Sequence, residues 1–407
     1  MREMKGSGVE WIGKIPKEWG IVKFKYLHNG LNTGEAIDKE YWESDAGPNA
    51  FYTAGLTPIR TGYSNFPTWK ETGINDLLLA RNGTPYVYLP VSKAYYTDHI
   101  IRAAMSRYVN RRFIRYCLQQ SIASIVVDSV SIPTWSATLW NNQILTWPSA
   151  IEQDRIAAFL DAECAEIDAV LEKTHASIEE YKKLKQAVIT QAVTKGIRGE
   201  RPMKDSGIAW IGTCPLNWTV CRIKNVIFPQ EKEVLPDDEI ITCFRDGEVT
   251  LRKNRREDGF TVSFTEHGYH GVDKGDLVIH GMDAFAGAIG CSDSRGKTTP
   301  VVHTCKTAGN NRFFMYFLRS MAYGNILMDL SNGVRIRSSD FRNFTKLGVF
   351  GAVMPPLEEQ NEIVDYIDGI VIQMDRLIQK KENLLTEIEN YKKSMIYEYV
   401  TGKKEVV

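Results

Sequence analysis

Residues 8–19 read GVEWIGKIPKEW, and residues 207–218 read GIAWIGTCPLNW. Two further matches follow in the same order along the chain: RRFIRYCL at 111–118 with NRFFMYFL at 311–318, and Glu-Gln at 152–153 with Glu-Gln at 359–360. The sequence is therefore one unit of roughly 200 residues written twice, which indicates two large repeats and not an array of short ones.

Each repeat ends in a predicted long helix. From Ile363 to Met395 the seam positions are spaced by alternating steps of four and three residues, and a similar stripe starts at Ile156. This spacing keeps one face of a helix against a partner along its whole length, so we predict that the two helices pack on each other, antiparallel, about a pseudo-twofold axis. The predicted seam consists of Ile156, Leu160, Ile167, Val170, Ile178, Ile363, Ile367, Ile370, Met374, Leu377, Leu384 and Ile388.

The rest of each repeat is predicted to be a mixed, strand-rich domain, with short buried strands at 76–80 and 276–279. Prolines at 148 and 355 mark the helix entries. The predicted fold class is therefore α+β: two strand-rich domains alternating with two long helices that form an antiparallel coiled coil. The predicted boundaries are 1–147 and 199–354 for the domains, and 148–198 and 355–407 for the helices.

Composition limits the class of protein. The 407 residues include 50 Lys and Arg against 50 Asp and Glu, so the formal net charge is zero. The strand-rich blocks carry a small excess of cations and the helices a small excess of acids, which is a weak indication of phosphate binding by the blocks. Seven cysteines without CxxC spacing, a charged N-terminus and no long apolar run predict a reduced, cytoplasmic protein without a secretion signal or a membrane span.

Loops are the part in which the two repeats differ most. Cations cluster at 252–256, and others lie at 295–297 and 335–337. Arginine binds guanine bidentately, Lys and Arg neutralise phosphates, and an Asn or Thr can reach adenine or a phosphate. The candidate DNA-binding residues are Arg60, Arg81, Asn82, Thr84, Lys93, Arg252, Lys253, Arg255, Arg256, Arg295, Lys297, Arg335 and Arg337. Taken singly, each could also belong to a solvated surface loop.

No catalytic or metal-binding motif is found in the sequence. Residues 295–298 resemble the end of a phosphate loop, but Cys291 occupies the position of the first glycine. The histidines and cysteines between 267 and 305 lack the spacing of a zinc site. The GxSxG, HExxH and EF-hand patterns and the Pro-Pro element of adenine methyltransferases are also missing. We therefore predict no catalytic residue and no metal in this chain.

The repeated EWIG and AWIG stretches, at 10–13 and 209–212, resemble the opening of a target-recognition domain. PPLEEQ at 355–360, with the heptad helix that follows and YKKSMI at 391–396, resembles a conserved spacer; in the first repeat PSAIEQ at 148–153 departs from that form. In the order domain, helix, domain, helix, nearly the whole chain resembles the DNA-specificity (S) subunit of type I restriction–modification systems.

The resemblance implies a non-catalytic reader of double-stranded DNA. Each domain would read one half of a split target, and the antiparallel helices would set the gap between the halves. Two methylation subunits and the restriction subunits would be its partners. S-adenosylmethionine, ATP and Mg would be bound by those partners and not by this chain.

Two alternatives stay open from the residues alone. One is a self-contained nuclease or methyltransferase with its own active site, against which the missing motifs argue. The other is a stand-alone DNA-binding regulator or scaffold that works without catalytic partners.

Overall fold

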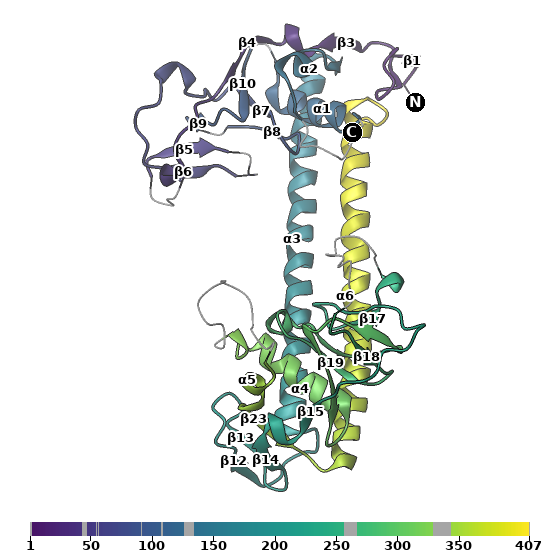
Figure 1. Cartoon of the computed structure of the whole chain (residues 1–407). Helices are drawn as coiled ribbons and strands as arrows, with labels where there is room; N and C mark the ends of the chain where they lie inside the picture. The colour runs from purple at the N-terminus through teal and green to yellow at the C-terminus, as the bar shows by residue number, and fades with distance from the viewer. Residues whose placement is uncertain are drawn as a thin grey trace. The chain divides into compact units, whose positions relative to one another are not determined.

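The structure is a computed structural model that describes residues 2–42, 47–53, 55, 57–90, 92–106, 109–125, 134–255, 267–328 and 343–406. The chain divides into two compact units, one formed by Met1–Thr174 with Asn383–Val407 and the other by His175–Glu382. Both units mix strands and helices, and each of the two long helices contributes to both of them (Figure 1). Among the described residues, no helix is long and apolar enough to cross a membrane.

The elements follow the predicted order. Those of the first repeat are β1 (Met4–Gly6), β2 (Lys14–Pro16), β3 (Gly20–Lys23), β4 (His28–Thr33), β5 (Asn49–Tyr52), β6 (Ile59–Thr61), β7 (Leu77–Ala80), β8 (Val87–Tyr88), β9 (Tyr95–Tyr96), β10 (Ile100–Met105), α1 (Arg111–Ala123), α2 (Ala137–Asn141), β11 (Ile144–Trp147) and α3 (Ala150–Lys195).

Those of the second repeat are β12 (Met203–Asp205), β13 (Thr213–Pro215), β14 (Thr219–Arg222), β15 (Ile227–Pro229), β16 (Ile241–Cys243), β17 (Val249–Leu251), β18 (His270–Val272), β19 (Leu277–His280), β20 (Ile289–Cys291), β21 (Gly296–Thr298), β22 (Val302–Thr307), α4 (Asn311–Tyr323), α5 (Thr345–Gly348), β23 (Gly351–Met354) and α6 (Leu357–Val400).

Each unit contains a four-stranded antiparallel sheet of the same connectivity. The strand order is β4-β10-β7-β8 in the first unit and β15-β22-β19-β20 in the second. Strands β7 and β19 occupy interior positions, and their apolar side chains are fully buried, as expected for short apolar runs covered on both faces. The prediction of a buried strand in each repeat is therefore confirmed.

The elements inserted into this frame differ between the units. The first unit adds a three-stranded sheet of order β6-β5-β9, in which β5 and β9 are parallel. The second unit adds two antiparallel pairs, β16 with β17 and β18 with β21. The divergence of the two sequences between their matched stretches therefore corresponds to different inserted sheets on one repeated frame.

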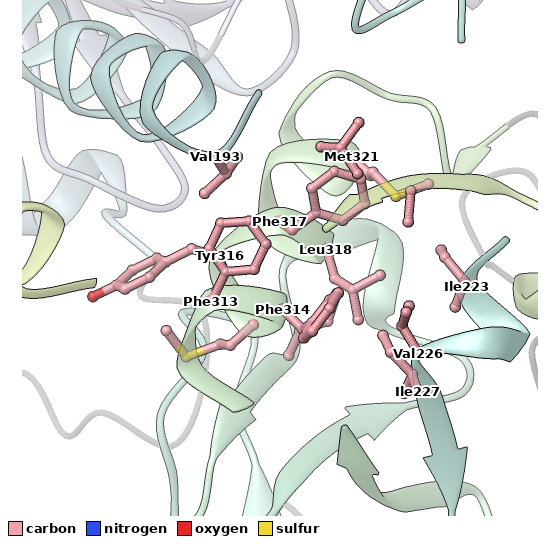
Figure 2. Close-up of a cluster of buried hydrophobic side chains, with 14 of the residues drawn as sticks. Val193, Ile223, Val226, Ile227, Phe313, Phe314, Tyr316, Phe317, Leu318 and Met321 are labelled. Atoms are coloured by element: carbon pink, nitrogen blue, oxygen red, sulfur yellow. The ribbon is translucent and has the colours of Figure 1, made fainter. Parts of the chain in front are cut away.

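One helix forms the centre of each domain core. In the second unit, Phe313, Phe314 and Phe317 of α4 are fully buried, and Figure 2 shows them clustered with Val193 and Ile223. In the first unit, α1 buries its apolar face in the corresponding cluster. Each helix is preceded by an N-cap asparagine, residue 110 or 310, whose side-chain oxygen accepts hydrogen bonds from two amides of the first turn.

Within each unit, α3 and α6 contact each other and run in opposite directions. In the first unit the contacts include Lys392 with Asp168 (2.5 Å) and the rings of Tyr399 and Phe159 (centroids 4.5 Å apart). In the second unit they include Lys185 with Asp375 (2.5 Å) and Lys381 over the ring of Tyr181 (5.6 Å). In both units, residues later in α3 contact residues earlier in α6, so the two helices are antiparallel.

Three of the twelve residues of the predicted seam are exposed, and the apolar residue that follows two of these is buried in its place. Val170, Leu377 and Leu384 are 47%, 42% and 44% exposed, whereas Ile378 and Leu385 are 8% and 7% exposed. The physical reason is that an apolar residue directly follows each exposed one, so the heptad pattern fits either residue equally well. Ile156, Leu160, Ile178, Ile363 and Ile367 are buried, and Ile167, Ile370, Met374 and Ile388 are partly buried.

A glutamate carboxylate joins each domain to the start of its long helix. In the first unit, Trp19 Nε1 donates to Glu152 (3.0 Å), which also pairs with Arg2 (2.5 Å). The equivalent contacts in the second unit are Trp218 Nε1 to Glu359 (3.0 Å) and Arg201 to Glu359 (2.5 Å). The Glu359 side chain is only 1% exposed. The two stretches that are repeated in the sequence, the tryptophan stretch and the Glu-Gln pair, therefore bind each other.

The burial of Ile378 beside the exposed Leu377 gives a first prediction. Ile378→Ala should lower the free energy of unfolding by about 2–4 kcal/mol, because it removes buried methyl groups and leaves a cavity. Leu377→Ala, on the neighbouring exposed position, should change it by no more than about 0.5 kcal/mol. Thermal denaturation followed by circular dichroism would compare the two, and equal effects would contradict the observed seam.

The buried carboxylate gives a second prediction. Glu359→Gln keeps the volume of the side chain but leaves Arg201 without its counter-charge, so the second unit should lose about 3 kcal/mol of stability. Glu358→Gln is the matched control, because Glu358 is exposed one residue earlier in the same turn. If the denaturation midpoint fell equally for both variants, the ion pair of Glu359 with Arg201 would not contribute specifically to stability.

Candidate nucleic-acid interface

Loops that differ between the units leave the four-stranded sheets at the same end. In the first unit, the start of β10 at Ile100 pairs with the end of β7 at Ala80 and lies beside the end of β4 at Thr33. In the second unit, the end of β19 at His280 pairs with the start of β22 at Val302. We call this end of each sheet the loop edge.

The loop that follows β7 is held firmly at the loop edge of the first unit. Trp135 donates its backbone N–H to the carbonyl of Arg81 (2.6 Å) and its indole N–H to that of Gly83 (2.7 Å). The side chain of Asn82 lies within hydrogen-bond distance of His99 (2.8 Å). Arg81 and Thr84 are exposed on this loop. The structure therefore brings together three of the predicted DNA-binding residues, Arg81, Asn82 and Thr84, on a fixed backbone.

The other two candidates of the first unit lie at the inserted sheet. Arg60, on β6, is exposed and donates to the carbonyl of Pro48 (3.1 Å). Lys93 precedes β9, is 80% exposed and pairs with Glu71 (3.0 Å). The inserted sheet is attached to the loop edge by backbone hydrogen bonds, including that from the N–H of Glu35 to the carbonyl of Tyr96 (2.9 Å).

At the loop edge of the second unit there is a cavity of about 710 Å³ with a mixed polar and apolar lining. It is lined by Ile241, Thr242, Cys243, Phe244, Arg245, Asp246, Arg252, Arg255, His280, Asp283, Thr298, Thr299 and Val302. Guanidinium, hydroxyl and carboxylate groups thus line the same cavity. Together they offer hydrogen-bond donors and acceptors to the edges of bases.

Two cations of this region, Arg255 and Lys253, are paired with carboxylates, and Arg252 binds a hydroxyl group. Arg255 binds Asp246 (2.6 Å) and Glu248 (3.0 Å), and its guanidinium lies 4.3 Å from the centroid of the Phe244 ring. Arg252 Nε donates to Thr242 (3.2 Å). Lys253 lies in the short 3₁₀ helix Arg252–Asn254 and binds Glu239 at 2.5 Å. Contact of Arg255 or Lys253 with a phosphate therefore involves an exchange of anionic partners.

The prediction of Arg295 as a DNA contact is not favoured by its position. Its guanidinium binds Asp238 (2.9 Å), Asp273 (2.5 Å) and the carbonyl of Glu233 (2.7 Å), and the hydrogen bonds with Asp238 above all raise its pKa. These contacts connect three loop segments, so Arg295 is a structural cross-link. Lys297 lies within β21 and is partly buried. Arg256, Arg335 and Arg337 lie outside the described residues.

Several residues at the loop edge of the second unit were not predicted from the sequence. Arg245, which pairs with Asp283 (2.9 Å), lines the cavity of the second unit together with Phe244 and His280. Phe244 and Arg245 lie about 35–39 positions before His280 and Asp283 in the chain, and no spacing rule joins the two groups. Among the described residues, no group of three or more His, Cys, Asp or Glu is arranged to hold a metal ion.

The tautomer of His280 is fixed by the turn that follows it. Its Nδ1 accepts hydrogen bonds from the N–H groups of Met282 (3.3 Å) and Asp283 (3.1 Å), so the proton of the neutral ring resides on Nε2. Burial lowers the pKa of His280. His280 is therefore a neutral ring in the cavity wall, with a single N–H donor.

Comparison with known proteins places these features in context. No family model matches the chain. The chain is 24% identical to the type I restriction enzyme MjaVIII specificity subunit of Methanocaldococcus jannaschii, over 97% of this chain and 94% of that protein. It is 21% identical to the type I restriction enzyme EcoDI specificity subunit of Escherichia coli, over 96% of this chain and 90% of that protein.

A solved structure of similar fold comes from work on complex assembly and conformational transition of the type I R-M system. It superimposes with a TM-score of 0.64 at 14% identity and covers 95% of this chain and 98% of its own. The resemblance to type I specificity subunits, predicted from the repeated stretches, is confirmed by the curated relatives over nearly the whole chain.

Three partly buried histidines give a prediction for pH. Burial lowers the pKa of His280, and also of His28 and His270, in the folded protein. Stability should therefore be full above the unfolded value of about 6.5 and should fall as the pH drops below it, because the unfolded chain then binds protons that the folded protein does not.

His280→Asn should reduce this acid sensitivity, since an asparagine oxygen can accept the same two N–H groups and does not titrate. Thermal midpoints between pH 7.5 and 5 would measure the slope. His267→Asn, at an exposed ring, is the control. A slope that is the same in His280→Asn and in the unaltered protein would show that His280 does not contribute.

Proposed function

We propose that this chain is the DNA-specificity subunit of a type I restriction–modification complex and that it has no catalytic activity of its own. The observation that carries the proposal is the repeated frame, on which unlike loops occupy the same sheet edge in both units. The full-length similarity to specificity subunits supports it.

Each domain, in this proposal, reads one half of a bipartite duplex target through its loop edge. A repeated frame holds two domains in equivalent relations to their helices, while different loops allow different base sequences to be read. In the first unit the candidates are Arg81, Asn82 and Thr84, and in the second the groups that line the cavity. Side chains of these types form the usual contacts to base edges and phosphates.

The two long helices, as an antiparallel coiled coil, would set the gap between the half-sites and dock the partner subunits. Away from the seam they carry exposed apolar side chains: Val170, Leu384 and Tyr391 in the first unit, and Leu184, Ile372 and Leu377 in the second. Val170 and Leu377 are equivalent in the two repeats, as are Leu184 and Tyr391. Equivalent apolar positions in both units suit two copies of one partner, the methylation subunit.

The chemistry belongs to the partners in this proposal. Methylation subunits would supply S-adenosylmethionine and flip an adenine out of each half-site, since the target atom is inaccessible within the duplex. Restriction subunits would supply ATP- and Mg-dependent translocation and cleavage. This chain would contribute target recognition and the positions of the docked subunits.

The test is the adenine methylation pattern of a methylation-free host that carries this chain and its methylation subunit. The expected result is a split motif with two short fixed halves and a gap of fixed length. A stable assembly of the two proteins without any methylation would instead favour a stand-alone regulator or scaffold.

The coiled-coil role makes a sharper prediction. Seven residues inserted after Leu171 and seven after Ile388, at facing levels judged from the Asp168–Lys392 pair, preserve the heptad pairing on both sides. The helices lengthen by about 10 Å at about 1.5 Å per residue, so the gap should grow by up to about three base pairs of about 3.4 Å each.

The bases read at both ends should stay the same after this double insertion. Insertion into α3 alone is the control, because it puts the two helices out of register and should abolish methylation. A changed base preference at either end would refute the assignment of the helices to spacing.

A further inference from the structure

Trp69 is a large apolar side chain that the fold leaves in water. All nine tryptophans lie in the described part of the chain, and Trp69, at 63% exposure, is the one that is prominently exposed. Isolated exposed apolar side chains are common on protein surfaces, so exposure alone assigns no role. What distinguishes Trp69 is the way in which its backbone is held.

The turn that carries Trp69 is held by hydrogen bonds from a mostly buried arginine, Arg102. Arg102, on β10, donates from Nη1 to the carbonyls of Trp69 (2.9 Å) and Glu71 (3.0 Å), and its Nε lies 2.9 Å from a carboxylate oxygen of Asp76. The side chains of Arg102 and Asp76 are only 18% and 8% exposed. Hydrogen bonds to a charged, poorly hydrated group are stronger than neutral ones, so the 3₁₀ turn Thr68–Lys70 has little freedom to move.

The chain is also anchored on both sides of this turn. Before it, Phe66 is buried and stacks on Tyr95 with ring centroids 4.2 Å apart. After it, Thr72 is buried and exchanges hydrogen bonds with Ala94 (2.8 and 3.1 Å). The indole is therefore presented on a rigid support, which lowers the entropic cost of a contact with a partner.

Trp69 also lies near the candidate DNA-binding loop. Its neighbour Lys70 donates to the carbonyl of Gly34 (2.9 Å), and Gly34 in turn donates to the carbonyl of Ile100 (3.2 Å) at the start of β10. Ile100 pairs with Ala80, the residue before Arg81. A short series of contacts thus connects the Trp69 turn to the loop edge of the first unit.

The second repeat has no counterpart of residues 65–69. A partner protein that docks once on each repeat would use features that both repeats share, whereas the two half-sites of a split target differ. A feature unique to one unit therefore fits DNA better than a protein partner.

We propose that Trp69 is a stacking residue that enters a base step of the half-site read by the first unit. This inference rests on the proposed function. Apolar wedges inserted between bases unstack one step and bend the duplex, and stacking of a base on an aromatic ring is sensitive to removal of the ring. The neighbouring loop would read bases through hydrogen bonds, and Trp69 would add a preference for a base step that is easily deformed.

The experiment uses the complex of the chain with its methylation subunits and a duplex that contains its mapped target. Trp69→Ala should weaken binding about five- to hundredfold, as expected for loss of one stacked base, and Trp69→Phe should stay within a few fold of the unaltered protein. With 2-aminopurine placed in turn along the first half-site, the adenine flipped by the methylation subunit should brighten on binding in both the unaltered and the Trp69→Ala complexes. One further position should change its fluorescence on binding of the unaltered complex, and Trp69→Ala should abolish that second signal.

Tyr26→Ala is the matched control. Tyr26 is 70% exposed, has Lys25 over its ring as Trp69 has Lys70, and precedes β4 at the end opposite the loop edge. The DNA affinity of the Tyr26→Ala complex should stay within twofold of that of the unaltered complex. An equal effect of both variants would overturn the proposal.

Other outcomes separate the remaining explanations. Unchanged affinity and unchanged 2-aminopurine fluorescence in Trp69→Ala would overturn the stacking role while leaving the proposed function intact. Loss of assembly with the methylation subunit, or a lowered thermal midpoint, would assign Trp69 to protein contact or to the fold. If the unaltered complex bound no split target, the proposed function would fail and this inference with it.

Discussion

The contact on which the rest of the structure depends is made by the glutamate at the start of each long helix, which is buried in the second unit and partly buried in the first. Transfer of a carboxylate out of water costs several kcal/mol unless it is paired and hydrogen-bonded. Here an arginine and an indole N–H supply both requirements, and the helix N-terminus favours negative charge. Because the three groups come from three separate segments, the contact fixes the domain on its helix. Its repetition gives both domains the same attachment.

The frame could be predicted from the sequence because the residues that build it are the ones that recur. The tryptophans, the Glu-Gln pair and the helix that begins at residue 111 or 311 each contact another repeated segment. The burial along the long helices was predictable only in part, since Leu377 and Ile378 are both apolar and the spacing in the sequence cannot decide which of them is buried. Tertiary packing alone made that choice.

The loop residues could not be predicted because their roles depend on partners far away in the sequence. Arg295 binds a carboxylate 57 residues before it, and Arg102 supports a turn 33 residues before it. A cation in a loop has the same local signature whether it faces DNA or closes such a cross-link. Trp69 shows the converse, because nothing in its local sequence distinguishes an exposed tryptophan from a buried one. Only the partners of Arg102 reveal that the exposed ring has a rigid support.

One consequence of the division into units concerns synthesis of the chain. The second unit is continuous, from His175 to Glu382, whereas the first needs residues from both ends of the sequence. Thr146, for example, donates a hydrogen bond to the carbonyl of Val400, 254 residues later. During translation from the N-terminus, the later-encoded unit is therefore the first to have all its residues, and the earlier-encoded domain waits for α6. A ribosome that stalls after the second unit would leave the core around Leu160 without Met395 and Val400, with apolar surface open to chaperones or to aggregation.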